Sequence, residues 1–462
     1  MSTAAQEQLF QYPFVSSLQK QDAQQTLRLA TFTVGKQPRP FFFQGQLARP
    51  RRVADQLRSV MTIVKSRFHI PAAMLTRILA ESDPVVTGND DLLRFEGFSA
   101  CCGAYVRVDL LPDAFTGEAT GRGTTNVDFN QPMLAALAKV RATDKVSLAV
   151  GADKVVLKTL GAEVVEKKVR LPQRWMKGFV EVQSVQSRMQ HACQIQGPQA
   201  FRFFRGLPRM KTHRRETFVT QSGQGLRLTQ LASSGGVRVG GLERLRVLES
   251  LSRDANTLDI YSDQTTGASG WVLSYDDCRF QLVISPEVWR GFSGEGQALD
   301  TLAKSDKDHL SKVHANLKWQ SVDVEQIARS TKLKADSVQS ALAMLGTRGL
   351  VGFDLKANAW FHRELPFDVS QVEKQQPRLK AARKLLAEKK VRLFKQSKTR
   401  AEFRINSSDV EHRVKIESVA KSESTISKCT CPWFNKHEHS RGPCKHILAA
   451  QILLEESLEK QS

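Results

Sequence analysis

The stretch KCTCPWFNKHEHSRGPCKHILAAQ, residues 428–451, contains two cysteines one residue apart and, after twelve intervening residues, a cysteine and a histidine one residue apart. Three thiolates and one imidazole make a closed tetrahedral set, and such soft ligands select zinc over hard cations. A closed set leaves no coordination position for water or substrate, so we expect a structural site. The ligand candidates are Cys429, Cys431, Cys444 and His446.

The flanking sequence indicates how the chain presents these ligands. Residues 424–428 form a β-prone run that leads into the first cysteine pair, and residues 446–460, HILAAQILLEESLEK, have the pattern of an amphipathic helix. His437 and His439 lie in the loop between the ligand pairs, where either could in principle replace a ligand or contribute to a second site. We expect both to be solvated loop residues.

The pattern Cys-x-Cys, loop, Cys-x-His followed by an apolar helix resembles a SWIM zinc finger over residues 401 to about 455. The resemblance implies a β-β-α layout, zinc-ligand roles for the four residues above, and binding to DNA or to another protein. It also implies that residues 401–409 and 411–419 supply the two strands. More loosely, the whole chain resembles bacterial SWIM-containing proteins often encoded beside a MoxR-type AAA+ ATPase and a von Willebrand A-type protein. That resemblance implies such an ATPase as a protein partner.

Composition limits the class of protein. The chain has 462 residues, 41% of them hydrophobic, and 68 Lys and Arg against 47 Asp and Glu give it a formal net charge of +21. No apolar run approaches the roughly 18 residues of a membrane span, and residues 1–14 lack a secretory pattern. Three of only seven cysteines fall in the quoted stretch, which favours metal ligation in a reducing compartment. We therefore expect a cytoplasmic, basic protein that does not enter a membrane.

Hydrophobic periodicity predicts an α+β protein of several domains. The six predicted segments are an N-terminal tail that is partly disordered (1–38), a mixed α/β domain (39–190), a β-rich domain (191–296), a winged-helix-like module (297–366), a basic linker helix (367–400) and the β-β-α zinc finger (401–462). Within the mixed domain, a helix followed by alternating strands resembles a subdomain of a DNA sliding clamp. The adjacent Cys101 and Cys102 are predicted to be structural thiols in a strand.

The winged-helix prediction rests on one run of sequence. Residues 322–351 fit two short helices with a break near Lys332, and the following residues alternate like a two-stranded ribbon that turns at Ala357 and Asn358. Winged helices read DNA with the second helix, although many mediate protein contacts. The second helix carries few bases on its exposed face. We therefore expect an independently folded unit that serves mainly for docking or spacing.

Two basic segments are candidates for phosphate contact. Residues 371–400 carry eleven Lys or Arg against two acids, and part of this run has apolar residues at helical spacing. A basic amphipathic helix of this kind can cover a phosphate backbone or a membrane surface, or can present a solvated face. We expect phosphate contact here because the zinc finger is adjacent. The candidates in this segment are Arg383, Lys384, Lys389, Lys390 and Arg392.

The second segment is AFRFFRGLPRMKTHRRETF, residues 200–218, which combines arginines with phenylalanines. Arginines that bind phosphates beside rings that stack on bases suit single-strand binding. Alternation around Phe201, Arg202 and Phe203 favours a plain strand with its phenylalanines inward. Its candidate contacts are Arg202, Arg205, Arg209, Lys211, Arg214 and Arg215.

Signals of catalysis are weak. The glycine-rich segments lack the Gly-Lys-Ser/Thr ending of a phosphate loop, and the carboxylate pair Asp276 and Asp277 has no histidine or glutamate companion. The predicted function is therefore non-enzymatic binding of nucleic acid, DNA in preference to RNA, with structural zinc. Two alternatives stay open. One is an adaptor that works with a MoxR-type ATPase, and the other is an enzyme with an unrecognised site in residues 39–292.

Overall fold

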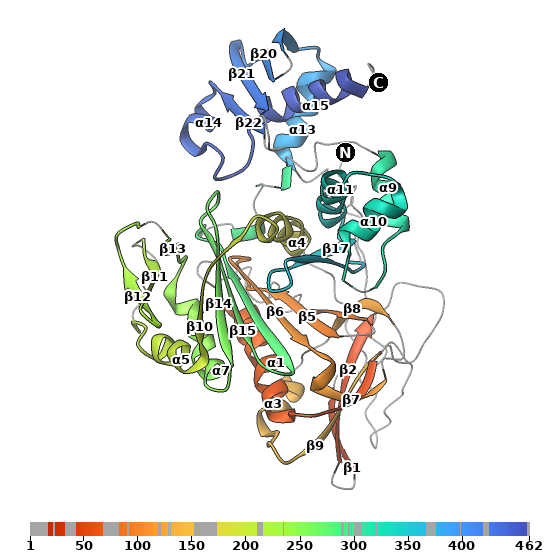
Figure 1. Ribbon diagram of the computed structural model, residues 1–462, viewed down its shortest axis with the longest axis vertical. Helices are drawn as coiled ribbons and strands as arrows, with labels where there is room; N and C mark the ends of the chain where they lie inside the picture. Colours follow the sequence, from red (N-terminus) through yellow and green to blue (C-terminus); the bar gives the residue numbers. More distant parts are fainter. Residues whose placement is uncertain are drawn as a thin grey trace.

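The body of the protein is built on one large sheet, and a smaller four-stranded sheet lies at the C-terminal end (Figure 1). This computed structural model describes the following residues, apart from a few positions inside the ranges: 17–21, 24–32, 43–67, 83–89, 92–118, 122–151, 173–209, 216–287, 291–299, 307–365, 376–418 and 425–459.

The large sheet has thirteen strands and crosses the predicted boundary between residues 190 and 191. Its pairs are antiparallel except that β2 runs parallel to β9. Because β16 pairs with β6, the two predicted N-terminal domains share one continuous sheet among the described residues. In spatial order the strands are β10 (Gln190–Gln196), β14 (Thr257–Asp263), β15 (Ala268–Ser274), β16 (Cys278–Ile284), β6 (Ala104–Leu110), β5 (Leu93–Phe98), β4 (Val85–Gly88), β8 (Gly123–Val127), β2 (Gln24–Phe32), β9 (Lys145–Gly151), β3 (Phe43–Leu47) and β7 (Phe115–Glu118), with β1 (Ser17–Gln21) on β2.

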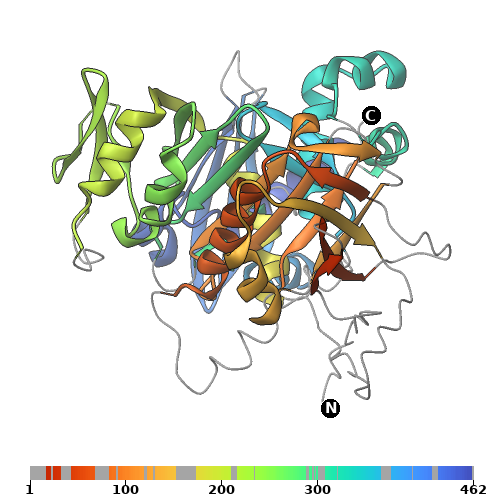
Figure 2. The same ribbon diagram turned by 90° about the horizontal axis from the view of Figure 1, so that it is seen from below.

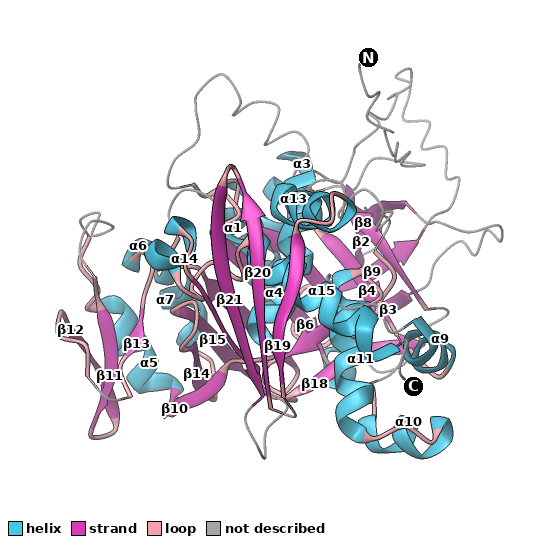
Figure 3. Cartoon of the chain, turned by 90° about the horizontal axis from the view of Figure 1, so that it is seen from above, coloured by secondary structure: helices cyan, strands magenta, loops and turns pink. Residues whose placement is uncertain are grey.

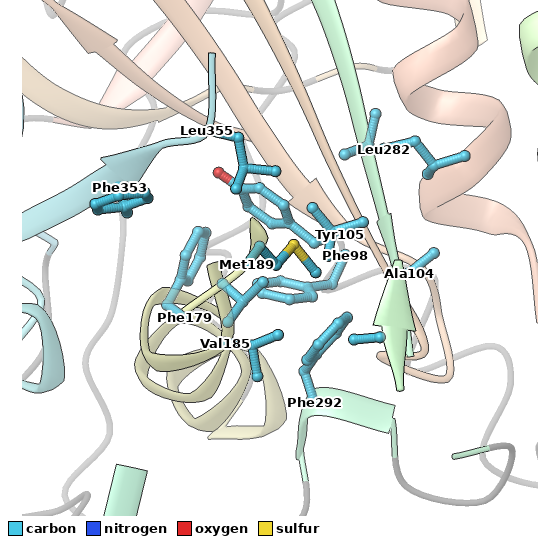
Figure 4. Close-up of a cluster of buried hydrophobic side chains, with 14 of the residues drawn as sticks. Phe98, Ala104, Tyr105, Phe179, Val185, Met189, Leu282, Phe292, Phe353 and Leu355 are labelled. Atoms are coloured by element: carbon cyan, nitrogen blue, oxygen red, sulfur yellow. The ribbon is translucent and has the colours of Figure 1, made fainter. Parts of the chain in front are cut away.

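Helices cover both faces of the middle of this sheet. Helix α1 (Pro50–Lys65) packs on β5 and β6, and α4 (Gln173–Gln186) lies on the opposite side of the strands (Figure 4). The Phe98 ring meets the Phe179 ring edge-on with centroids 4.9 Å apart, and the centroid of the Tyr105 ring lies 5.3 Å from that of Phe98. Every residue of β5 and β6 is buried, so these strands form the centre of the core.

Smaller elements surround this centre. Helix α3 (Gln131–Lys139) lies beside α1 on the face seen in Figure 2. A three-stranded sheet forms a separate lobe. The remaining elements of the body are β11 (Phe218–Ser222), β12 (Gly225–Thr229), β13 (Val237–Arg238), α5 (Gly197–Arg205), α6 (Leu242–Leu245), α7 (Val247–Ser252), η1 (Pro112–Ala114) and η2 (Gly291–Ser293).

Two local predictions in the body are wrong. Residues 197–205 form helix α5 instead of a strand, because Phe204 and Ala200, four residues apart, share the buried side of the helix. Cys101 and Cys102 lie in the turn between β5 and β6 rather than in a strand, and Cys102 has a φ of 53° there. Residues 152–172 of the predicted mixed α/β domain lie outside the described residues.

Residues 307–365 contain the expected order of helices and ribbon. The elements are α9 (Lys307–Ala315), α10 (Val324–Thr331), α11 (Ala335–Thr347), β17 (Val351–Asp354) and β18 (Ala359–His362). Lys332 ends α10 in the left-handed region, and Asn358 adopts a φ of 48° in the ribbon turn. Helix α11 packs between α9 and α4, so most of the presumed recognition helix is buried. Assignment of this unit as a winged helix stays a prediction.

A buried ion network joins the β17–β18 ribbon to the large sheet. Asp354 accepts contacts from Arg94 at 3.1 Å and Arg107 at 3.0 Å, and Asp109 pairs with Arg94 at 2.7 Å. These charges come from different elements and are almost fully removed from water, so loss of one would leave a buried, unbalanced charge. The ribbon is thus held by the body, which differs from the independent unit that we expected.

The C-terminal unit, residues 376–459, has its own sheet in the order β19-β20-β21-β22 (Figure 3). Its elements are α13 (Pro377–Ala387), β19 (Val391–Gln396), β20 (Arg400–Ser407), β21 (Val410–Ser418), β22 (Thr425–Cys429), α14 (Pro432–His437) and α15 (Lys445–Glu459). Helices α13 and α15 pack on each other, and α15 contacts three of the four strands.

The predicted basic linker helix is wrong in its second half. The helix ends at Ala387, Lys389 turns the chain with a φ of 54°, and residues 391–396 enter the sheet as β19. Buried Val391 opposite Ile405 accounts for the strand, because both side chains join the core under the sheet. Residues 377–396 therefore belong to the C-terminal unit, and they extend the sheet by one strand at its edge.

None of the described helices is both long and apolar enough to cross a lipid bilayer.

Candidate metal centre

Three elements of the C-terminal unit bring the four predicted ligands together. Cys429 is the last residue of β22, and Cys431 caps helix α14. Pro432 occupies the first position of α14, where a missing N–H costs no hydrogen bond. Cys444 directly precedes α15, and His446 lies in its first turn. One strand end and two helix starts thus converge on one point.

The geometry of the cluster fits zinc. All four side chains are buried, with at most 5% of each residue exposed, and their ligand atoms lie within 4.8 Å of one another. Cys429 Sγ lies 3.7 Å from His446 Nδ1. Tetrahedral zinc at usual Zn–S and Zn–N lengths places such atoms about 3.6 Å apart. His446 would therefore bind through Nδ1, and the four residues form a structural zinc site.

The backbone supports negative charge on the sulfur atoms. The Phe434 N–H donates to Cys431 Sγ and the Ile447 N–H donates to Cys444 Sγ, both at 3.4 Å. Hydrogen bonding from Cys429 lowers the pKa of the Cys431 thiol, and the same contact raises the pKa of Cys429. The Cys431 and Cys444 sulfur atoms both lie at the positive end of a helix, which favours the thiolate form. A bound cation then favours deprotonation of all three thiols.

The remaining histidines near the cluster do not join it. His437 packs on Trp433, His439 lies beside Phe434, and neither belongs to a ligand group among the described residues. The His412 ring packs against the His446 ring at a tilt of 36°, with centroids 4.3 Å apart. Burial lowers the pKa of His412, so a neutral ring covers the ligand histidine at neutral pH.

Residues 412–452 match the SWIM zinc finger family. This segment is a SWIM zinc finger. The predicted SWIM finger and zinc as its cofactor are thereby confirmed, and the four predicted ligands are the residues that cluster. No curated protein sequence matches the chain. Among solved structures, the chain is similar to proliferating cellular nuclear antigen from Entamoeba histolytica, with a TM-score of 0.35 and 8% identity over 54% of this chain and 99% of that chain.

The predicted phosphate contacts lie in two separate places. Arg202, Arg205 and Arg209 are exposed on α5 and the turn that follows it, whereas Lys211, Arg214 and Arg215 lie outside the described residues. The other set is exposed in the C-terminal unit, residues 376–459, which contains the SWIM segment and is called the finger below: Arg383 and Lys384 on α13, Lys389 and Lys390 in the next turn, and Arg392 on β19. Helix α5 and the finger lie at different ends of the molecule (Figure 1), so the described members of the two sets form no single surface. Their binding role stays a prediction.

The structure reveals a further basic surface that the sequence reasoning missed. On one side of the finger sheet, Phe403, Ile405 and Val414 pack inward against the helices. The alternate residues face water, and we call this side the open face. Its basic residues are Arg392, Lys395, Arg400, Arg404, Arg413, Lys415 and Lys428, and its acidic residues are Glu402, Glu411 and Glu417. The alternation of RAEFRINS, residues 400–407, is the signal that could have identified it.

Proposed function

We propose that this chain is a cytoplasmic, non-enzymatic protein that binds nucleic acid on the open face of its zinc-stabilised SWIM finger. The observation that carries the proposal is a row of three arginines across adjacent strands. Arg392 lies directly opposite Arg404, which lies directly opposite Arg413. Lys415 of β21 and Lys428 of β22 form another directly opposed pair of like charges.

Like charges in directly opposed positions destabilise a sheet, by a few tenths of a kcal/mol or more for each pair. A protein that keeps several such pairs on one face has a use for the concentrated charge, and a polyanion would neutralise it. The three acids of this face pair with two of its arginines, Glu402 and Glu417 with Arg400 and Glu411 with Arg404. Among the described residues, Arg392, Arg413, Lys415 and Lys428 pair with no carboxylate. These cations are available to phosphate groups.

Zinc supports this surface from beneath. Cys429 ends β22 and lies opposite Val414 of β21, so the metal site fixes the two strands that carry Arg413, Lys415 and Lys428. No zinc ligand lies on the open face, because all four are buried under the sheet. The metal thus has a structural role, while the charged side chains make the contacts.

A protein partner is the second candidate, and one observation favours it. Four of the large apolar side chains exposed among the described residues lie on the finger: Leu393, Phe394, Val410 and Ile426. An adaptor that docks a MoxR-type AAA+ ATPase would use such residues. Complexes held by apolar contacts persist at high salt, whereas phosphate contacts weaken steeply as salt rises.

The salt dependence of binding therefore tests the proposal. The triple variant Arg392→Gln, Arg404→Gln, Arg413→Gln is compared with the parent chain by titrating labelled DNA and RNA at several salt concentrations. If each arginine contacts a phosphate, the log-log slope of affinity against salt flattens by about 2 to 3 units, at about 0.7 to 0.9 per contact.

The matched control neutralises three exposed cations outside the C-terminal unit, in Lys312→Gln, Lys318→Gln, Arg329→Gln. We expect this control to keep the parent slope. Zinc content is measured for every variant, because a finger that has lost zinc also loses the sheet. Parent-like affinity and slope in the zinc-loaded triple variant would refute the proposal.

A further inference from the structure

One aromatic side chain on the finger is unusually exposed. Phe394 lies on the edge strand β19 with 58% of its surface accessible to solvent, and the neighbouring Leu393 is 40% exposed. Full burial of a phenylalanine side chain stabilises a protein by roughly 1.5 to 3 kcal/mol. Phe394 does not contribute this stabilisation, because its ring stays exposed while other apolar residues of the same unit are buried under α13 and α15.

The local backbone accounts for the position of the ring. Pairing of β19 with β20 shifts register between Leu393 and Lys395, so Phe394 is the extra residue of a β-bulge. The guanidinium of Arg404 lies over the Phe394 ring, 4.0 Å from its centroid. Arg404 is the central member of the arginine row. The ring is thus held by a cation at the row that we propose contacts phosphate.

The width of the sheet argues against insertion into a duplex. Adjacent strands are about 4.8 Å apart, so the outer strands of this four-stranded sheet are about 14 Å apart before side chains are added. The major groove of B-DNA is about 12 Å wide and accepts a helix or a two-stranded ribbon. A broad face of this kind meets a duplex only at its backbones, where Phe394 would find no base to contact.

A single strand offers both kinds of contact at once. Its bases are free to stack on an aromatic ring, and its phosphates can follow a row of cations. We infer that the open face binds single-stranded nucleic acid, with one base stacked on Phe394 and its phosphates on the row formed by Arg392, Arg404 and Arg413. This inference rests on the proposed function and names the class of nucleic acid that the site accepts.

The experiment compares Phe394→Ala with the parent in the zinc-loaded full chain. A labelled oligothymidylate and a labelled duplex of equal length are titrated and followed by fluorescence anisotropy. Because stacking of one base contributes about 1 to 3 kcal/mol, Phe394→Ala should weaken single-strand binding about 5- to 150-fold. Its effect on the duplex should be less than twofold. Phe394→Trp should restore single-strand affinity, and its indole fluorescence should be quenched by the bound strand.

Val410→Ala is the matched control, because Val410 is a comparably exposed apolar residue of the same finger at the start of β21. It should bind both oligonucleotides like the parent. A parent chain that prefers the duplex, or a Phe394→Ala variant that binds the single strand normally, would overturn the inference. If the arginine triple variant still loses affinity in that case, the proposed function stands. Loss in neither variant would overturn both and leave a protein partner as the explanation of the exposed ring.

Discussion

Replacing Cys444 by serine tests the zinc site most directly, because serine keeps the size of the side chain and removes the thiolate. Helix α15 begins at the next residue and carries Ile447 and Leu448, both fully buried. Burial of two such side chains contributes about 3 to 6 kcal/mol. Structural zinc in finger peptides contributes about 10 to 16 kcal/mol. Zinc binding therefore stabilises the finger more than the burial of these two side chains does, and apolar packing cannot replace the metal.

We expect Cys444→Ser to unfold residues 376–459 and to leave the body folded. The main contacts of α13, α15 and strands β19 to β22 are with one another, and the described link to the body includes the ion pair between Arg441 and Glu287. Loss of this unit removes little of the packing around Phe98 and Phe179 in the body.

Limited proteolysis with mass spectrometry, together with zinc analysis, measures this outcome. Cleavage should become rapid within residues 376–459 and stay slow in the large sheet. A strong chelator should produce the same pattern in the parent chain. Ser440→Ala, an exposed change in the same loop, serves as the control and should keep about one zinc per chain. Protection of residues 376–459 in zinc-free Cys444→Ser protein would refute this account.

Three further expectations concern other parts of the chain. Asp354→Ala should lower the free energy of unfolding of the body by about 3 to 5 kcal/mol, because buried Arg94 and Arg107 lose their shared carboxylate. Thermal unfolding measures this loss of stability, and an unchanged midpoint would contradict the prediction. Burial, with a smaller effect from His314, lowers the pKa of His362 to about 4. The folded protein should therefore lose at most about 3 kcal/mol of its free energy of unfolding as pH falls from 6.5 toward 4. In denaturant titrations at several pH values, His362→Gln should flatten this pH dependence, and an equally steep profile in the variant would exclude the effect. Joint neutralisation of Lys384, Lys389, Lys390 and Arg392 should flatten the salt slope of nucleic-acid binding, mainly through the loss of Arg392. Lys384 and Lys390 should contribute little because both already pair with Glu388. A slope change of several units would show that the turn after α13 also contacts phosphate.

The zinc ligands could be predicted from the sequence because their chemistry is local. Four ligand residues within 18 positions have few alternative meanings, and the short spacings Cys-x-Cys and Cys-x-His carry the whole signal. The ribbon turn at Asn358 was predictable for the same reason, since its residues are adjacent in the chain.

Elements that depend on distant partners could not be predicted. Val391 and Leu393 fit both a continued helix and a strand, and only the partner Ile405 decides between the two. Phe201 and Phe203 alternate over too few residues to exclude a helix, and contact of Phe204 with Trp271 is visible only in three dimensions. Alternation in residues 400–407 indicates one strand of the open face, but placing Arg392 and Phe394 beside Arg404 required the register of β19 on β20 and the bulge at Phe394.

The pairing of β6 with β16 has a consequence for synthesis of the chain. Val108 pairs with Phe280, so β6 is synthesised roughly 170 residues before its partner strand β16. At 5 to 20 residues per second, this interval lasts on the order of 10 to 30 seconds. During that time the unpaired edge of β6, a strand that is buried in the folded protein, is open to other nascent chains. The yield of soluble protein should therefore depend on chaperone supply and translation speed more than on zinc, which is needed only when the last residues emerge.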